Sequence, residues 1–155
     1  MPVKRLRYKD DRAVSMRGDD LLAIRTDEAA VKVLKAEAKS RGNLHESVVG
    51  EASDSLMKYD GRPNPSTLAF ITRMLRLNGQ HDDAELFERL QNEEIHAENL
   101  VHLIFTCSGN HPRAALETNA ESPNPRIRRI LVGFWIDEYQ DFIRSLFEAI
   151  DATIP

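Results

Sequence analysis

Two short proline-containing segments limit how this chain can fold, because no regular helix or strand can run through them. Residues 60–65 read DGRPNP and residues 121–125 read ESPNP. Proline lacks a backbone N–H and restricts the residue before it, so regular elements end at such segments. The chain of 155 residues is therefore divided into three stretches, and we predict a module boundary at the first segment.

Apolar residues recur at steps of three and four on both sides of the first segment, which is typical of amphipathic helices. The helices predicted in this way span residues 27–42, 44–59, 66–79, 82–107 and 126–150, with one or two turns at 113–120. Asn43, with Glu46 three residues later, is expected to cap the second helix. Residues 21–26, LLAIRT, alternate weakly and favour a short strand or the lead-in to a helix. The predicted fold class is mainly α, a helical bundle with at most one short N-terminal strand.

The charge is unevenly distributed along the chain. The formal net charge is −4, yet residues 1–17 are basic and the chain beyond residue 61 is acidic. This predicts three parts: a flexible basic arm (1–20), a small module (21–60) and a helical bundle domain (61–155). A basic arm suits contact with a polyanion, and a solvated tail is the alternative.

Composition indicates an ordinary globular protein. Hydrophobic residues are 41% and charged residues 30% of the chain. No apolar stretch approaches the roughly 20 residues that a membrane span needs, so no membrane contact is expected. Cys107, the single cysteine, has no partner for an internal disulfide, which favours a reducing compartment and a cytoplasmic location.

Enzyme signatures are sparse. The phosphate-binding and nucleophile motifs are absent, and five scattered histidines with one cysteine do not form a zinc pattern. Glu93 and His96 have the Glu-x-x-His spacing of metal-binding helical bundles, but the motif is not repeated. Glu94 falls in the predicted apolar stripe, where an arginine partner (Arg73, Arg76 or Arg129) or a role as general base would explain it. We predict no catalytic residue, no metal site and no cofactor.

A basic and aromatic segment opens the last predicted helix. It combines Arg126, Arg128 and Arg129 with Phe134, Trp135 and Tyr139. Nucleic-acid stacking is one interpretation. Aromatic residues in the core, with the arginines on acidic neighbours, are the favoured interpretation, and an oligomer contact is a third.

Residues 22–57 resemble a ribbon-helix-helix segment of the Arc/MetJ type. A short strand, a first helix, a glycine, a polar cap and a second helix follow one another, with Val48, Val49 and Ala52 where that family places an apolar pair and an alanine. The resemblance implies that two chains pair their strands into a ribbon in the DNA major groove, and that the second helix binds a phosphate at its N-terminus. Arg25 would then read a base, and Asn43 and His45 would lie at the phosphate.

The sequence therefore predicts a non-enzymatic, homodimeric DNA-binding regulator or accessory protein whose residues 61–155 bind a protein partner. The nucleic-acid-binding residues expected are Lys4, Arg5, Arg7, Arg12, Arg17, Arg25, Asn43 and His45. The alternative is a helical interaction subunit of a larger nucleoprotein or defence assembly, without sequence-specific DNA reading. A third hypothesis is a bundle metal enzyme built on Glu93, Glu94 and His96.

Overall fold

The computed structural model describes residues 9–11, 14–15, 19–26 and 31–152. Its centre is a four-stranded sheet in the order β3-β4-β5-β6, formed by β3 (Leu21–Thr26), β4 (Val31–Arg41), β5 (Leu100–Ser108) and β6 (Arg128–Trp135). β3 is antiparallel to β4, whereas β4, β5 and β6 are parallel to one another. A separate two-stranded sheet joins β1 (Lys9–Asp11) and β2 (Val14–Ser15).

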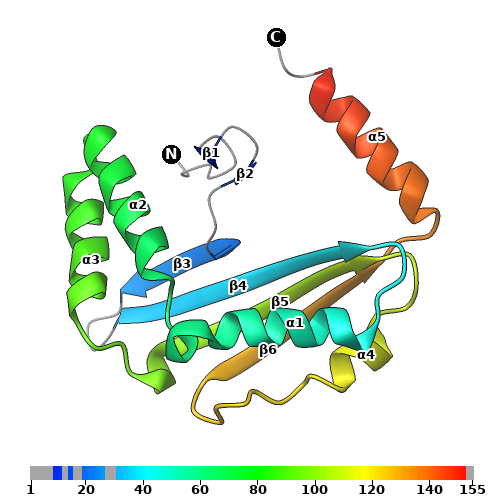
Figure 1. Ribbon diagram of the computed structural model, residues 1–155, viewed down its shortest axis with the longest axis horizontal. Coiled ribbons are helices and arrows are strands. Elements are labelled where there is room, and N and C mark those ends of the chain that lie inside the picture. The colour runs from blue at the N-terminus through cyan, green and yellow to red at the C-terminus, as the bar shows by residue number, and fades with distance from the viewer. Residues whose placement is uncertain (1–8, 12–13, 16–18, 27–30, 153–155) are drawn as a thin grey trace.

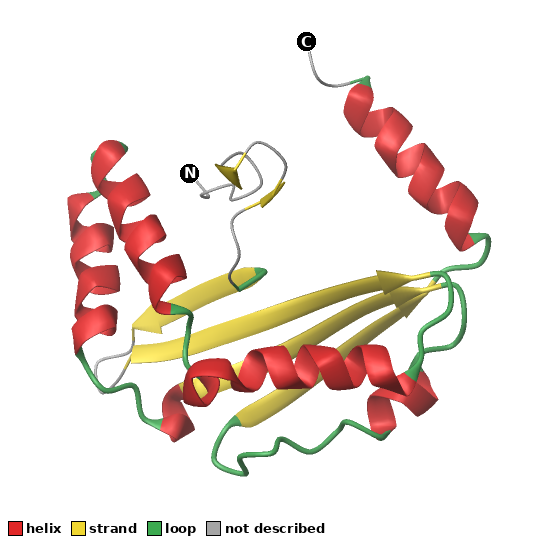
Figure 2. Cartoon of the chain, in the orientation of Figure 1, coloured by secondary structure: helices red, strands yellow, loops and turns green. Residues whose placement is uncertain are grey.

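Helices lie on one face of the large sheet and beyond its ends (Figure 1). α1 (Glu46–Met57) and α4 (Arg113–Glu117) cover one face, and α2 (Pro65–Leu77) stands beside α3 (His81–Asn92) next to β3. The short 3₁₀ helices η2 (Lys58–Gly61) and η3 (Ala97–Asn99) lie in the connections. α5 (Tyr139–Asp151) follows β6 and points away from the sheet (Figure 2). No described helix is both long enough and apolar enough to cross a membrane.

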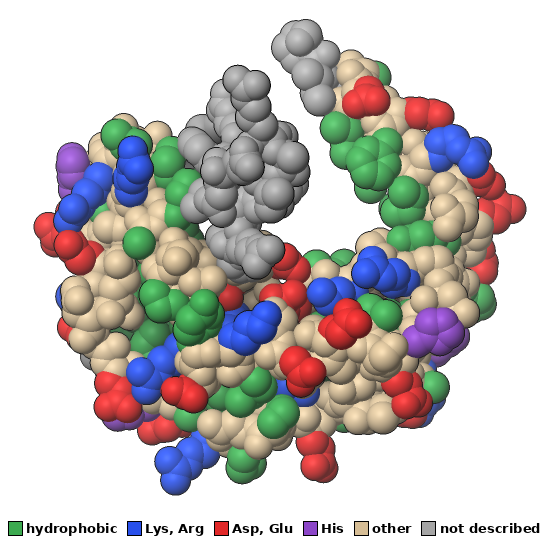
Figure 3. Space-filling model, viewed as in Figure 1, with side chains coloured by type: hydrophobic (Ala, Val, Ile, Leu, Met, Phe, Trp, Pro, Cys, Tyr) green, Lys and Arg blue, Asp and Glu red, His purple; other side chains and the backbone are tan. Residues whose placement is uncertain are grey.

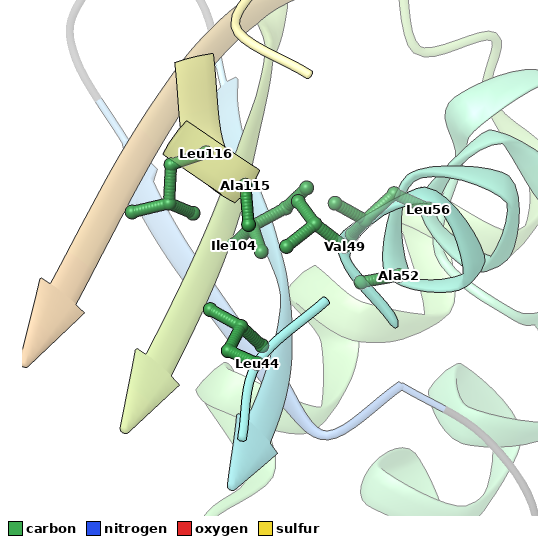
Figure 4. Close-up of a cluster of buried hydrophobic side chains, with 7 residues drawn as sticks. All are labelled: Leu44, Val49, Ala52, Leu56, Ile104, Ala115 and Leu116. Atoms are coloured by element: carbon green, nitrogen blue, oxygen red, sulfur yellow. The ribbon is translucent and has the colours of Figure 1, made fainter. Parts of the chain in front are cut away.

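The main core lies between α1, α4 and β5 (Figure 4). It contains buried aliphatic side chains of Leu44, Val49, Ala52, Leu56, Ile104, Ala115 and Leu116. Val49, Ala52 and Leu56 belong to α1, and Leu44 lies two residues before that helix. Their spacing is the one predicted for the helix over residues 44–59. A second cluster joins the sheet to α2 and α3 through Val33, Leu68, Leu90, Ile95, Leu100 and Ile127.

The predicted mainly-α fold class is wrong, because three segments read as helix are strands. Residues 31–41 form β4, the second half of the predicted helix 82–107 contains β5, and the first half of the predicted helix 126–150 contains β6. β4 and β5 each have a neighbouring strand on both sides, whereas β6 lies at the edge of the sheet. In β5 and β6, apolar residues stand on both faces of the sheet, so the sequence shows no clean alternation of period two, although the burial of β5 does alternate.

The ribbon-helix-helix interpretation is also wrong in its geometry. Residues 21–26 do form a strand, but β3 pairs with β4 of the same chain, over residues that were predicted as the first helix. The strand is thus followed by a second strand instead of a helix. The cap also differs, because His45 precedes α1 and no side chain in the described part of the chain caps that helix.

The helices over residues 44–59 and 66–79 are confirmed to within two residues at each end by α1 and α2. Asn64 and not Ser66 caps α2, since the Asn64 side chain accepts a hydrogen bond from the Ser66 N–H. The one or two turns at 113–120 correspond to α4.

Candidate functional site: a carboxylate and lysine cluster on two strands

Five charged side chains gather where β3 begins and β4 approaches its end: Asp19, Asp20, Lys35, Glu37 and Lys39. The antiparallel register of β3 and β4 explains why these side chains lie close together. Leu21 pairs with Ala36, so one step further along the register Asp20 falls opposite Glu37. Residues 35, 37 and 39 alternate with their neighbours along the strand and therefore share one face of the sheet.

The space-filling view shows a hollow between the α2–α3 pair and α5, with charged side chains of both signs beside it (Figure 3). Asp20 is exposed and Lys39 is half-buried, whereas Glu37 lies beneath them with only 8% of its side chain exposed. An incoming ligand would meet Asp20 and Lys39 first.

Glu37 is held from two sides. Its Oε1 accepts a hydrogen bond from the Ser55 hydroxyl on α1 at 2.8 Å, and its Oε2 lies 3.7 Å from the Lys39 ammonium. Burial raises the pKa of Glu37 above its usual value, and the neighbouring carboxylates of Asp20 and Asp19 raise it further, against the opposing effects of Ser55 and Lys39. A positive charge placed between Asp20 and Glu37 would therefore stabilise the ionised form of Glu37.

Asp20 is fixed by the backbone of the adjacent strand. Its Oδ2 accepts a hydrogen bond from the Ala38 N–H at 2.9 Å, and Ala38 is the residue between Glu37 and Lys39. One oxygen is therefore oriented toward β4. This contact ties the two carboxylates to the same short stretch of backbone.

Asp19 and Lys35 form the structural part of the cluster. Asp19 Oδ1 lies 3.5 Å from the Lys35 ammonium, and Asp19 Oδ2 accepts a hydrogen bond from the Asn64 N–H at 2.8 Å. Lys35 also donates to the carbonyl oxygens of Leu56 and Arg62, each at 3.0 Å. Burial lowers the pKa of Lys35, and the Asp19 carboxylate opposes this effect. These contacts fasten the end of α1 and the start of α2 to the sheet.

Asp20, Glu37 and Lys39 are therefore the side chains of the cluster that are available to bind a ligand. Magnesium in phosphate-processing sites commonly uses one or two carboxylates and completes its coordination with water and substrate phosphate. Two carboxylates fixed on neighbouring strands fit such an ion. In the described part of the chain no three His, Cys, Asp or Glu side chains are grouped as a metal site, so a complete protein cage is not the arrangement here.

The residues predicted to bind nucleic acid are not brought together where they can be located. Lys4, Arg5, Arg7, Arg12 and Arg17 lie outside the described residues. Arg25 pairs with Lys32 near the start of β4, whereas Asn43 and His45 follow the other end of that strand. An 11-residue strand is about 35 Å long at roughly 3.3 Å per residue, so one contact point cannot include both ends.

The residues weighed as a bundle metal site occupy a surface connection. Glu93 ends α3, and His96 precedes η3. Glu94 is 70% exposed at its side chain and pairs with Arg62 at 3.1 Å. The prediction that Glu94 lies in a buried apolar stripe with Arg73, Arg76 or Arg129 as its partner is therefore wrong. The reason is that α3 ends at Asn92, before Glu94, instead of continuing to residue 107.

The basic and aromatic segment is also rearranged. Arg129 donates to the backbone carbonyl oxygens of Asn119 and Glu121, in place of an acidic side chain. Trp135 is 54% exposed and donates its indole N–H to the Gly109 carbonyl at 3.2 Å. The expectation of a core tryptophan is thus wrong.

Sequence reasoning missed Asp20, Glu37 and Lys39. The signal was a carboxylate directly before the weakly alternating hexapeptide LLAIRT and a Glu-x-Lys pair that begins 17 residues later. On a helix the Glu37 and Lys39 side chains would point in different directions, whereas on a strand they share a face. Assigning residues 27–42 to a helix therefore hid the pair.

Comparison with known proteins identifies relatives over nearly the whole chain. The family model described as HamA matches residues 1–150. The chain is 31% identical over 153 residues to the Hachiman protein HamA of Bacillus cereus, an alignment that covers 98% of this chain and 54% of that protein. This chain thus spans about half the length of the curated relative it matches. The suggested ribbon-helix-helix kinship is therefore wrong, and the prediction of a DNA-binding transcription regulator that rested on it is not supported.

Proposed function

The chain belongs to the HamA family, and on that premise we propose that it is a component of a Hachiman-type defence assembly that hydrolyses nucleic-acid phosphodiester bonds with a divalent cation. The observation that carries the chemical part is the meeting of Asp20, which directly precedes β3, with Glu37 and Lys39 on β4. The assembly part rests on the name of the relative, Hachiman protein HamA. It agrees with the alternative drawn from the sequence, a subunit of a defence assembly that binds a protein partner.

The donor set favours phosphodiester chemistry over other reactions. Asp20 and Glu37 would hold the cation, and the Lys39 ammonium beside Glu37 would hold a phosphate oxygen of the substrate. When bound, such a cation supplies positive charge that lowers the pKa of a coordinated water and stabilises charge on the phosphate. Lys39 adds a second positive charge at the same place, which stabilises the transition state because the attacked phosphate gains negative charge there.

The proposed step is a hydrolysis. The oxygen of a water molecule forms a bond to phosphorus while the bond from phosphorus to one ester oxygen breaks. The attacking water gives up a proton to solvent, and the departing ester oxygen takes one from solvent. Asp20 and Glu37 keep their ionised form throughout, so the residues of the chain orient the reactants and do not react.

A hydrolase that cuts nucleic acid takes the place of the DNA-reading regulator expected from the sequence. The sequence also predicted a protein without enzymatic activity, and that prediction is untested. The nucleic acid is here a substrate held by its phosphate. No base-reading ribbon is needed. Nothing in the proposal depends on Arg25, Asn43 or His45.

The test combines cation binding with cleavage. The full chain, with Mg²⁺ or Mn²⁺, is incubated with labelled single-stranded DNA, duplex DNA and RNA. We expect cleavage that chelation abolishes, and a loss of at least about 100-fold in Asp20→Asn, Glu37→Gln and Lys39→Ala, the size typical for a removed transition-state contact. Glu85→Gln, an exposed acid on α3, is the matched control.

Binding of Mn²⁺, followed by electron paramagnetic resonance, gives a second readout that needs no partner protein. We expect Asp20→Asn and Glu37→Gln to weaken it, and Lys39→Ala and Glu85→Gln to leave it unchanged. Equal Mn²⁺ binding by all variants, together with cleavage that does not depend on Asp20 or Glu37, would refute the proposed site.

A further inference from the structure

A cavity of about 450 Å³ lies between β3 and the α2–α3 pair. Its volume falls within the range of small-molecule sites, which are mostly apolar with a few polar groups. The inner wall carries the rings of Phe70 and Phe87 and the aliphatic side chains of Leu22 and Ile71. The polar residues of its lining are Asp19, Asp20, Thr67, Gln80 and Asp83.

The cavity is continuous with the proposed cation site. Asp20 lines the cavity and also accepts the hydrogen bond from Ala38 between Glu37 and Lys39. Neighbouring nucleotides of one strand are separated by about 3.4 Å along a duplex axis. A phosphate held at Asp20, Glu37 and Lys39 therefore brings the adjoining nucleotide to the cavity.

The chemistry of the cavity suits a base and not a phosphate. Asp19, Asp20 and Asp83 are acidic, and the cavity lining includes no lysine or arginine among the described residues. Anions are therefore disfavoured inside. Flat heterocycles stack on aromatic side chains without regard to sequence, and the cavity offers two phenylalanine rings.

The polar groups favour a base edge with N–H donors. The Gln80 side-chain amide donates to Asp83 Oδ2 at 3.2 Å, which orients both side chains. A carboxylate accepts hydrogen bonds and does not donate them. Amino and imino groups of a base can therefore pair with these acceptors.

From this geometry we infer that the cavity binds one unpaired nucleobase next to the phosphate that is cut. The inference rests on the proposed function and deepens it, since it makes single-stranded or locally unpaired nucleic acid the substrate class. A base inside a duplex would first have to leave the stack, at the cost of unstacking and unpairing. Single strands and frayed ends are therefore the preferred substrates.

The test measures the binding of a five-nucleotide DNA and of the same DNA with an abasic central nucleotide to the full chain. Fluorescence anisotropy is recorded with Ca²⁺ in place of Mg²⁺ to slow cleavage. We expect the abasic strand to bind about 10-fold more weakly, because it cannot fill the cavity. Ile71→Trp, which fills the cavity from α2, should bind both strands equally.

Leu77→Trp is the matched control, because Leu77 lies on the same helix and is 69% exposed. It should keep the full difference between the two strands. Phe87→Leu provides a second variant that leaves space but removes a stacking ring, and it should reduce the difference without abolishing it. Thermal melting of each variant verifies that it folds.

The outcomes separate this inference from the proposed function. A 10-fold difference in binding without cation-dependent cleavage would support the base cavity and refute the hydrolysis. Cleavage that depends on Asp20, with equal binding of both strands by the unaltered protein, would refute the base cavity alone. A difference that persists in Ile71→Trp would also refute it.

Discussion

Lys35 and His102 are paired residues of neighbouring strands, and both are buried although both can carry a charge. Their partners explain how each is tolerated. The Lys35 ammonium meets an aspartate and several carbonyl oxygens, so its charge is compensated. His102 Nε2 contacts the Gly61 carbonyl oxygen at 2.8 Å, and its buried Nδ1 has no hydrogen-bond partner among the residues that the structure describes.

Replacing Lys35 with methionine should destabilise the protein by about 3–5 kcal/mol, the cost typical of removing one partner from a buried ion pair. The change leaves Asp19 and the carbonyl oxygens of Leu56 and Arg62 without the ammonium that they contact. The free energy of unfolding in urea measures the effect. Lys58→Met, at an exposed position after α1, should change it by less than about 0.5 kcal/mol, and equal losses in the two variants would contradict this account.

The stability of the protein should fall when the pH drops below 6.5, the ordinary pKa of histidine, and His102 should be one cause. Burial lowers the pKa of His102, and the positive charges of Lys35 and Arg129 lower it further, against the effect of the Gly61 carbonyl. Below the ordinary value the unfolded chain takes up a proton that the folded protein does not. The contribution of His102 to the free energy of unfolding is therefore fully present above the ordinary histidine pKa. It is lost as the pH falls toward the lower pKa of His102 in the folded protein.

Urea unfolding at pH 7.5 and pH 5.0 measures this dependence. His102→Gln cannot be protonated in this range, so its unfolding free energy should fall less between the two conditions than that of the unaltered protein. His45→Gln, at an exposed position, should leave the dependence unchanged. Identical pH dependence in His102→Gln and the unaltered protein would show that His102 is not the cause.

At the scale of elements, the sequence predicted helices well where they lie on the surface of a sheet. α1 and α2 have one buried side, and their apolar residues recur at helical spacing. α4 was also predicted, because it is a short apolar run next to proline. These elements follow from local patterns, since one side of each faces the core and the other faces water.

The strands were missed for two physical reasons. β4 is rich in alanine and lysine, which favour a helix locally, and its pairing with β3 and β5 overrides that preference. β5 and β6 carry apolar residues on both faces, and such runs can be read with either period. The candidate site depended on β4 being a strand, so it could not be predicted before the fold was known.

The contact between β6 and α4 makes a glycine necessary at position 133. A Cβ atom there would lie 2.7 Å from Leu116 Cδ1 and 2.7 Å from Pro112 Cγ. We therefore expect Gly133→Ala to cost about 1–3 kcal/mol of unfolding free energy through overpacking. Gly50→Ala in α1 is the control, because the nearest atom to its Cβ, Asn119 Oδ1, is 4.0 Å away. This substitution should stabilise the helix by about 0.5–1 kcal/mol, and a loss equal to that of Gly133→Ala would exclude overpacking as the reason.

At the scale of the whole molecule, the order β3-β4-β5-β6 brings together residues from distant parts of the chain. Glu37 pairs with Ile104 across β4 and β5, and no local pattern indicates such a pairing. The sheet and the surface hollow over it arise only when the connections between the strands are folded. Helices could therefore be predicted from the sequence, whereas the arrangement of strands that forms the candidate site could not.

α5 is the least anchored of the described long helices, and its stability should reflect this. None of its residues is buried, and Phe142, Leu146 and Phe147 are 43–62% exposed. A 13-residue helix is marginal in water without packing. Hydrogen exchange followed by mass spectrometry should thus find the amides of α5 exchanging at least about 10-fold faster than those of α1, which lies over the core.

The dependence of this exchange on protein concentration tells whether another molecule covers the apolar side of α5. If the isolated chain alone sets the stability of the helix, the exchange rate is the same at 1 μM and 100 μM. Protection that increases with concentration would indicate that a second copy packs on α5. Slow exchange at both concentrations would contradict the exposed position of α5 and would require that the helix folds onto its own chain.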